Sequence, residues 1–166
     1  IEDAAYFRRV FTTIQKLVAQ GAILAGHDVA AGGLITTLLE MAFPAESTGL
    51  DLDLSALAEQ DPVRLLFSEK PGVVVQIDQS TSLEGIGAFP IGKVTVNPLL
   101  RITLNGEQFI FDILSLRENW FKTSYLLDRK QSGGELALER FRNFSKQPLK
   151  FSFQPGFSGQ YAQFGA

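Results

Sequence analysis

The chain has 166 residues, of which 45% are hydrophobic, enough to bury the core of one ordinary domain. A formal net charge of −3 argues against a nucleic-acid-binding protein, and the absence of cysteine excludes disulfides, thiolate metal sites and a cysteine nucleophile. A single histidine excludes a multi-histidine metal site. No apolar run approaches the roughly 20 residues that span a bilayer, so we expect a soluble, cytoplasmic protein without membrane contact.

The two ends of the chain indicate a piece of a longer protein. The sequence begins at Ile1 rather than at methionine, and it ends directly after an aromatic, glycine-rich stretch. Charge is also uneven, because residues 1–120 hold 8 Lys and Arg against 15 Asp and Glu, whereas residues 121–166 hold 7 against 3. We therefore expect the last quarter of the chain to differ in kind from the rest.

The beginning of the chain predicts alternating helices and strands. Asp3 is placed to cap a helix whose apolar residues recur at three- and four-residue spacing until Gly21 ends it. Residues 22–26 are small and apolar, which suits a short buried strand. A Gly-Gly pair then breaks the chain before a helix over residues 34–42. The expected motif is a strand, a glycine turn and a helix.

The middle of the chain is predicted to consist mainly of strands. Strict alternation of Leu and Asp over residues 50–54 is typical of a strand with one face in solvent, and an Asp-Pro pair starts a short helix over residues 61–67. The β-branched run 73–77 predicts a central strand, and residues 88–96 predict another strand.

Later elements complete a mixed architecture. A hairpin is predicted over residues 101–111, because Asn105 and Gly106 accept the positive φ that a two-residue turn requires. Helices are predicted over residues 114–127 and 136–144. Together the elements predict an α/β (α+β) fold in which a mixed β-sheet is flanked by helices.

The domain is expected to cover residues 1–146. In residues 147–166, prolines, glycines and phenylalanines lie among polar residues without any period. This composition predicts a linker that lies on another protein surface, because bare aromatic side chains in water favour contact.

The segment 26–34 is the part of the sequence best suited to chemistry. Asp28 follows the predicted buried strand, so its carboxylate is expected in a cleft, where it could hold a hard cation beside an anion. Gly32 and Gly33 place backbone N–H groups at the start of a helix, which favours phosphate and other anions.

The same residues have a purely structural interpretation. Asp28 can cap the helix by accepting backbone N–H bonds, while His27 packs against the sheet. His27 is disfavoured as a catalytic base, because no second titratable partner lies nearby in the sequence. A wet strand face explains Asp51 and Asp53, and a solvated or interdomain face explains the basic residues of the last quarter.

Four segments, in the expected order, resemble one family. Residues 26–43, which begin Gly-His-Asp-Val-Ala-Ala-Gly-Gly-Leu, resemble the His-Asp-x-Ser-Asp-Gly-Gly-Leu segment of the large, single-chain phosphoribosylformylglycinamidine synthases. Residues 65–74 resemble the strand-entry segment that follows in that family, residues 120–142 its exit helices, and residues 153–165 the stretch that leads into its glutaminase domain. The resemblance covers nearly the whole chain.

The resemblance implies a piece of an enzyme. The family converts formylglycinamide ribonucleotide, glutamine and ATP to formylglycinamidine ribonucleotide in de novo purine synthesis, with an ammonia-dependent synthetase portion and a C-terminal glutaminase. This chain would be the C-terminal, aminoimidazole-ribonucleotide-synthetase-like domain of the second synthetase half. Its partners would be the remaining synthetase and glutaminase domains of the same parent chain and small-molecule substrates, and the fragment alone would be inactive.

The resemblance also implies site residues. Asp28 corresponds to the family's Mg²⁺ ligand, and no catalytic residue is expected within the chain. Ala30 stands where the family has a serine that contacts the nucleotide, so only a backbone contact is left there, and Ala31 replaces the usual aspartate. Gly32 and Gly33 match the family, which implies a close approach of the backbone to a phosphate of ATP.

Two other functions stay open. Another ATP-dependent member of the same superfamily, such as a selenophosphate synthetase or a thiamine-monophosphate kinase, would share the fold but leave residues 153–165 unexplained. A scaffold domain would use Asp28 only as a cap. Substitution of Asp28 separates a cap from a metal ligand, because the loss of a cap costs about 1 kcal/mol of stability and leaves chemistry intact.

Overall fold

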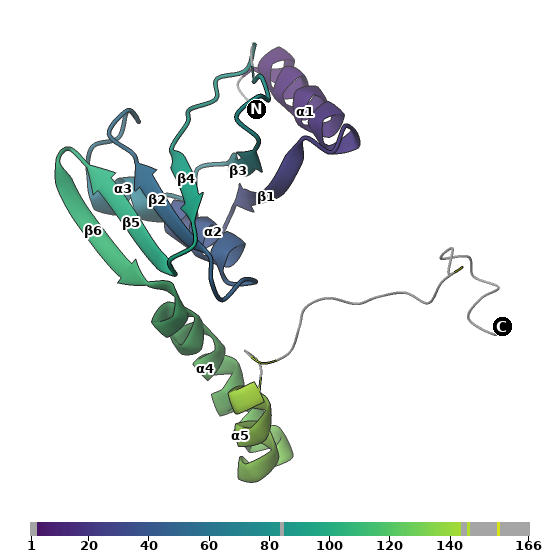
Figure 1. Ribbon diagram of the computed structural model, residues 1–166, viewed down its shortest axis with the longest axis vertical. Coiled ribbons are helices and arrows are strands. Elements are labelled where there is room, and N and C mark those ends of the chain that lie inside the picture. The colour runs from purple at the N-terminus through teal and green to yellow at the C-terminus, as the bar shows by residue number, and fades with distance from the viewer. Residues whose placement is uncertain (1–2, 84, 144–145, 147–155, 157–166) are drawn as a thin grey trace. The chain divides into compact units, whose positions relative to one another are not determined.

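The computed structural model describes residues 3–83, 85–143, 146 and 156, and the chain divides into two compact units, residues 1–121 and 122–166. Helices and strands alternate in the first part of the chain and are followed by further strands and then by two helices (Figure 1). In chain order they are α1 (Ala4–Ala19), β1 (Ile23–Val29), α2 (Gly33–Ala42), β2 (Gly49–Asp53), α3 (Pro62–Phe67), β3 (Gly72–Ile77), β4 (Gly92–Thr95), β5 (Leu99–Leu104), β6 (Glu107–Asp112), α4 (Ile113–Ser132) and α5 (Gly134–Asn143).

The larger sheet is mixed, as the sequence predicts. Its strand order is β4-β2-β5-β6, with β2 parallel to β5 and the other two pairs antiparallel. The alternation along β2 has the expected effect, since Leu50 and Leu52 are buried while Asp53 is exposed. The hairpin of β5 and β6 is confirmed as well, with positive φ values of 52° at Asn105 and 83° at Gly106.

The smaller sheet is an antiparallel pair of β1 and β3, and it corrects two predictions. Residues 22–26 were expected in a buried strand, yet side chains alternate along β1 between half-buried and exposed, and Leu24 is 61% exposed. The run 73–77 was expected to be central, but in the described part of the chain β3 pairs with β1 alone. The apolar composition of these two strands predicted that both of their faces would be buried. In the structure, packing covers only one face of the β1–β3 pair.

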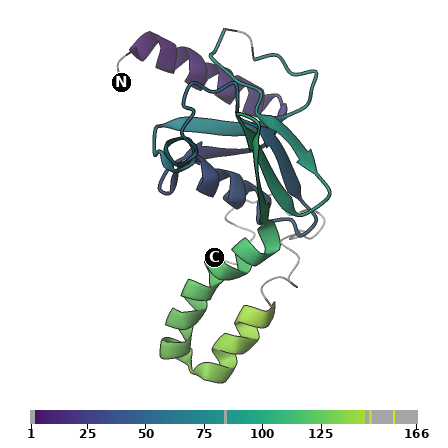
Figure 2. The same ribbon diagram turned by 90° about the vertical axis from the view of Figure 1, so that its left-hand side faces the viewer.

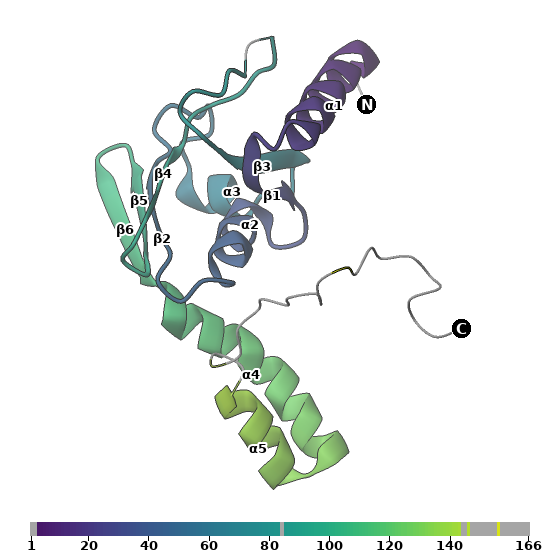
Figure 3. The same ribbon diagram turned by 45° about the vertical axis from the view of Figure 1, so that its right-hand side comes forward.

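The core of the first unit lies between the larger sheet and the two helices α2 and α3. Figure 3 shows these helices between that sheet and the β1–β3 pair. The buried cluster joins Leu38 and Ala42 of α2 to Leu66 of α3 and to Leu100 and Ile102 of β5. Each of these side chains is at most 7% exposed, so α2 is fixed against the larger sheet.

The predicted helix starts in the first unit are confirmed. The Asp3 carboxylate accepts a hydrogen bond from the backbone N–H of Tyr6 at 2.8 Å, and the Asp61 carboxylate accepts one from Arg64 at 2.9 Å. Gly21 follows α1 with a φ of 68°, as a helix-ending glycine does. The strand predicted over residues 88–96 is shorter than expected, because only β4 pairs within it.

The second unit contains a helical hairpin, and Figure 2 shows the last part of α4 alongside α5. Asp128 accepts two hydrogen bonds from the Arg140 guanidinium, at 2.8 and 2.7 Å, and the rings of Tyr125 and Phe141 stack with centroids 4.8 Å apart. Both predicted helices are confirmed, with α4 longer than expected. The linker predicted over residues 147–166 lies outside the described residues, apart from Gly156.

Candidate functional site

The candidate site is the turn between β1 and α2. The conformation of this turn is explained in the first place by its packing against the rest of the fold. Gly32 and Gly33 have φ values of 85° and 74°, a region that favours glycine. A Cβ on Gly33 would lie 2.7 Å from the Leu66 carbonyl oxygen and 2.8 Å from the Cα of Phe67. The turn thus passes directly against the last residues of α3, and a glycine is required there whether or not a ligand binds.

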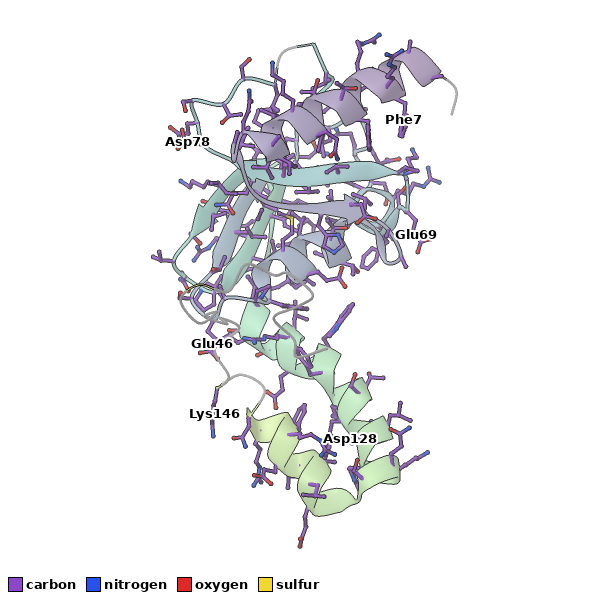
Figure 4. All side chains as sticks on the ribbon, turned by 90° about the vertical axis from the view of Figure 1, so that its right-hand side faces the viewer. Phe7, Glu46, Glu69, Asp78, Asp128 and Lys146 are labelled. Atoms are coloured by element: carbon purple, nitrogen blue, oxygen red, sulfur yellow. The ribbon has the colours of Figure 1, made fainter. Side chains whose placement is uncertain are left out.

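The backbone N–H groups of the turn have partners within the chain. Gly33 donates to the Ala30 carbonyl oxygen at 3.0 Å, and Gly32 donates to Oε1 of Glu69 at 3.0 Å. Glu69 lies on the loop between α3 and β3 and is labelled in Figure 4. Sequence analysis missed Glu69 as part of this turn, because 37 residues separate it from Gly32. The position expected to attract a phosphate is occupied in this structure by a carboxylate of the chain itself.

His27 lies on the face of β1 that packs against α2. Its Nδ1 lies 2.7 Å from the Asp28 carbonyl oxygen, and its Nε2 lies 3.2 Å from Oε2 of Glu40. Glu40 is a titratable partner that proximity in the sequence did not reveal. Thr37 and Glu40 are three residues apart on α2 and share a face, but only the packing of α2 against β1 shows that this face meets His27.

Asp28 lies on the opposite face of β1, where it pairs in register with Val73. Its side chain is 76% exposed. Its backbone carbonyl accepts a hydrogen bond from the Thr37 hydroxyl at 3.1 Å. The residue at the N-cap of α2 is Gly32, so the interpretation of Asp28 as the cap is wrong. The Asp28 carboxylate is therefore exposed on one face of β1, while the Thr37 hydroxyl of α2 holds the Asp28 backbone from the other face.

The side chains around Asp28 supply only a small part of what Mg²⁺ requires. Groups of three or more His, Cys, Asp and Glu side chains able to hold a metal are absent from the part of the chain that the structure describes. Mg²⁺ usually takes only one or two carboxylates and fills its remaining positions with water and substrate phosphates. The Asp28 carboxylate is chemically suited to be one such ligand, and the other ligands of such a site would have to come from outside the described residues.

The remaining acidic and basic candidates behave as surface groups. The Asp51 carboxylate lies 4.0 Å from Nζ of Lys93, and hydrogen bonds from Ser55 lower the pKa of Asp53. Arg140 binds Asp128, and this pairing lowers the pKa of Asp128 and raises that of Arg140. The contacts of Asp51 and Asp53 agree with the predicted wet strand face. Over the described residues, no helix combines the length and apolarity needed to cross a membrane.

Comparisons with known proteins give one family match. The sequence model of the family described as "AIR synthase related protein, C-terminal domain" matches residues 1–105. That range includes the whole β1–α2 turn, every strand of both sheets except β6, and the loop that carries Glu69.

Two curated relatives extend the similarity. One is the "Probable phosphoribosylformylglycinamidine synthase, chloroplastic/mitochondrial" of Arabidopsis thaliana, 34% identical over 166 residues and 95% of this chain. The other is the "Phosphoribosylformylglycinamidine synthase" of Homo sapiens, 30% identical over 151 residues and 84% of this chain. The chain spans 11% of the length of each relative.

The solved structures that match include "T. maritima PurL complexed with FGAR". The similarity covers 61% of this chain and 19% of that chain, with 22% identity and a TM-score of 0.49.

Proposed function

The chain belongs to the family of AIR synthase related proteins, as a C-terminal domain, and on this premise we propose that it is one domain of a phosphoribosylformylglycinamidine synthase. The observation that carries the proposal is the identity of 34% over 95% of the chain to a relative of that name. A second relative of the same name, from a distant organism, matches 84% of the chain. The reaction proposed is the conversion of formylglycinamide ribonucleotide to the amidine, with ATP and glutamine consumed.

In this role, the domain contributes Asp28 to an Mg²⁺-ATP site that other parts of the parent chain complete. Bound Mg²⁺ would neutralise charge on the transferring phosphoryl group. The exposed carboxylate of Asp28 can reach a ligand that approaches the outer face of β1, because 76% of the side chain is accessible. Asp28 orients the metal and moves no proton.

The turn residues would contribute backbone rather than side chains. Ala30, Gly32 and Gly33 offer no polar side-chain atoms, so contact with a phosphate must run through their N–H groups. For the N–H of Gly32, a phosphate must replace the Glu69 carboxylate that accepts its hydrogen bond at 3.0 Å. Movement of Glu69 is thus part of the proposal.

A scaffold role is the second candidate, and one observation favours it. The N–H groups of Gly32 and Gly33 are both satisfied within the chain, and the contact of Gly33 with α3 explains this glycine without a ligand. In that case the domain supports the active half of the enzyme and contributes no ligand. Under either candidate, the partners proposed are the remaining synthetase and glutaminase domains of the parent chain, and the proposed location is the cytoplasm.

The proposal is tested with the full-length parent enzyme and ammonia as the nitrogen source. ATP hydrolysis that depends on both formylglycinamide ribonucleotide and ammonia is the expected result. The 166-residue chain alone should give no such hydrolysis, because its described residues contain no group of three or more side chains able to hold a metal ion. A parent enzyme that hydrolyses ATP with a different acceptor, such as selenide or thiamine monophosphate, would overturn the proposed reaction.

A further inference from the structure

We propose that Glu40 is a positioning residue for Asp28 and acts through His27, an inference that rests on the proposed role of Asp28 as a metal ligand. Glu40 lies on α2, Asp28 lies on the outer face of β1, and the His27 ring lies between the helix and the strand. The two carboxylates are therefore linked through a single imidazole.

Both nitrogens of the His27 ring face an oxygen atom. A carbonyl oxygen only accepts hydrogen bonds, so Nδ1 donates to the Asp28 carbonyl across 2.7 Å. Nε2 lies 3.2 Å from Oε2 of Glu40 at the other end of the ring. Turning the ring over would break both contacts at once, so Glu40 determines the orientation in which Nδ1 reaches Asp28.

The backbone of Asp28 is anchored by two side chains in addition to the β1–β3 ladder. The Asp28 carbonyl accepts from His27 and also from the Thr37 hydroxyl, at 3.1 Å. Nδ1 of His27 lies 3.5 Å from Oδ1 of Asp28 as well, so the ring also lies beside the carboxylate. Thr37 is only 2% exposed, so close packing restricts the side chain on the α2 side of this arrangement.

His27 and Glu40 are more buried than Asp28, the residue that they position. The side chains of His27 and Glu40 are 34% and 31% exposed, whereas that of Asp28 is 76% exposed. An exposed carboxylate loses conformational freedom when it binds a metal. If the backbone of Asp28 and one side of its carboxylate are held in place beforehand, less conformational freedom is lost on binding. A residue that contacts a metal ligand in this way raises the affinity for the metal.

The test measures binding of Mn²⁺, as a paramagnetic substitute for Mg²⁺, to the full-length parent enzyme by electron paramagnetic resonance. The relevant site is the Mn²⁺ binding that Asp28→Asn removes. We expect Glu40→Ala to weaken Mn²⁺ binding at this site about tenfold. Glu40→Gln keeps a side chain of the same length, whose amide can accept a hydrogen bond from Nε2 or donate one to it, and should restore affinity to within about twofold of the unmodified enzyme.

A second variant and a control variant allow the positioning role to be tested even if Glu40→Ala unfolds. His27→Gln carries an amide toward the Nε2 position but has no donor at Nδ1, so it breaks the link at its other end and gives the same loss. Glu46→Ala is the control, because Glu46 is an exposed glutamate beyond the end of α2 and well separated from Glu69 in Figure 4. Melting temperatures are recorded for every variant.

Two results would overturn the inference, and they differ in what else they overturn. Unchanged Mn²⁺ affinity in both Glu40→Ala and His27→Gln, with binding lost in Asp28→Asn, refutes the positioning role and leaves the proposed metal ligand intact. Unchanged affinity in all three variants refutes the metal role of Asp28 and the positioning role with it.

Discussion

The β1–α2 turn and the β5–β6 turn both depend on glycine, yet for different reasons. Gly106 has a φ of 83°, and a Cβ there would meet nothing within 4 Å. Gly33 has a φ of 74°, and a Cβ there would overlap the backbone of Leu66 and Phe67. The hairpin turn is determined by its own two residues, whereas the turn at the candidate site is determined by a helix that comes about thirty residues later.

This difference separates what local conformation requires from what packing requires. The β5–β6 turn needs only a residue that accepts positive φ. The β1–α2 turn also needs the space that glycine leaves, a carboxylate from the loop before β3, and hydroxyl bonds from α2. A site built in this way is stable before any ligand arrives.

The largest expected effect comes from Gly33→Ala, with Gly106→Ala as its matched partner. Both alanines would adopt a left-handed conformation, which costs about 1 kcal/mol. At Gly33 the Cβ overlaps main-chain atoms that cannot move aside cheaply, so the loss of unfolding free energy should total about 3–4 kcal/mol. Chemical denaturation of the two variants measures the difference, and equal losses would show that α3 does not constrain the turn.

A smaller effect is expected from Glu69→Ala. This change removes the acceptor for the Gly32 N–H and a negative charge at the start of α2, and should cost about 1 kcal/mol of unfolding free energy. Glu69→Gln keeps the acceptor and should cost less than about 0.5 kcal/mol. Thermal unfolding compares both with Glu46→Ala, which should be neutral. A neutral Glu69→Ala would mean that the Gly32 N–H does not depend on this carboxylate.

The smallest effect is expected in the helical hairpin, where the contacts are local and exposed. The hydrogen bond from Arg140, and then that from Ser132, holds the pKa of Asp128 below its ordinary value of 3.8. A lowered pKa in the folded state gives stability that is present above the unfolded pKa and disappears as pH falls through the folded pKa.

Amide hydrogen exchange in α5, corrected for intrinsic rates, should therefore show protection that decreases below about pH 4. Asp128→Asn should lose most of this pH dependence, because it removes the titrating group from the Arg140 contact. A decrease of the same size in Asp128→Asn would assign the pH dependence to other carboxylates.

The sequence predicted elements governed by local rules. Asp3 and Asp61 cap helices as expected, and Asn105 forms the expected hairpin turn, because each depends on residues within four positions. The sequence could not predict that β3 lies at the edge of a sheet. A β-branched composition indicates a strand, but it does not indicate which strands pair with it.

The candidate site was only partly foreseen for a related reason. The segment that carries Asp28, Gly32 and Gly33 could be identified from its glycines and its position after a strand. Glu69 and Glu40 could not, because each meets the segment through tertiary packing. Residues that contact a turn from other helices, strands or loops are the part of a site that cannot be predicted from a single sequence.

This domain is proposed to contribute a metal ligand, Asp28, to the synthetase reaction. The most direct measurement is ammonia- and substrate-dependent ATP hydrolysis by the full-length parent enzyme carrying Asp28→Asn, together with its melting temperature. Asp51→Asn, on a wet strand face beside Lys93, is the matched control. We predict that Asp28→Asn abolishes activity at an unchanged melting temperature, with partial recovery in excess Mg²⁺. Activity that survives Asp28→Asn would contradict the metal role and leave the domain as a scaffold.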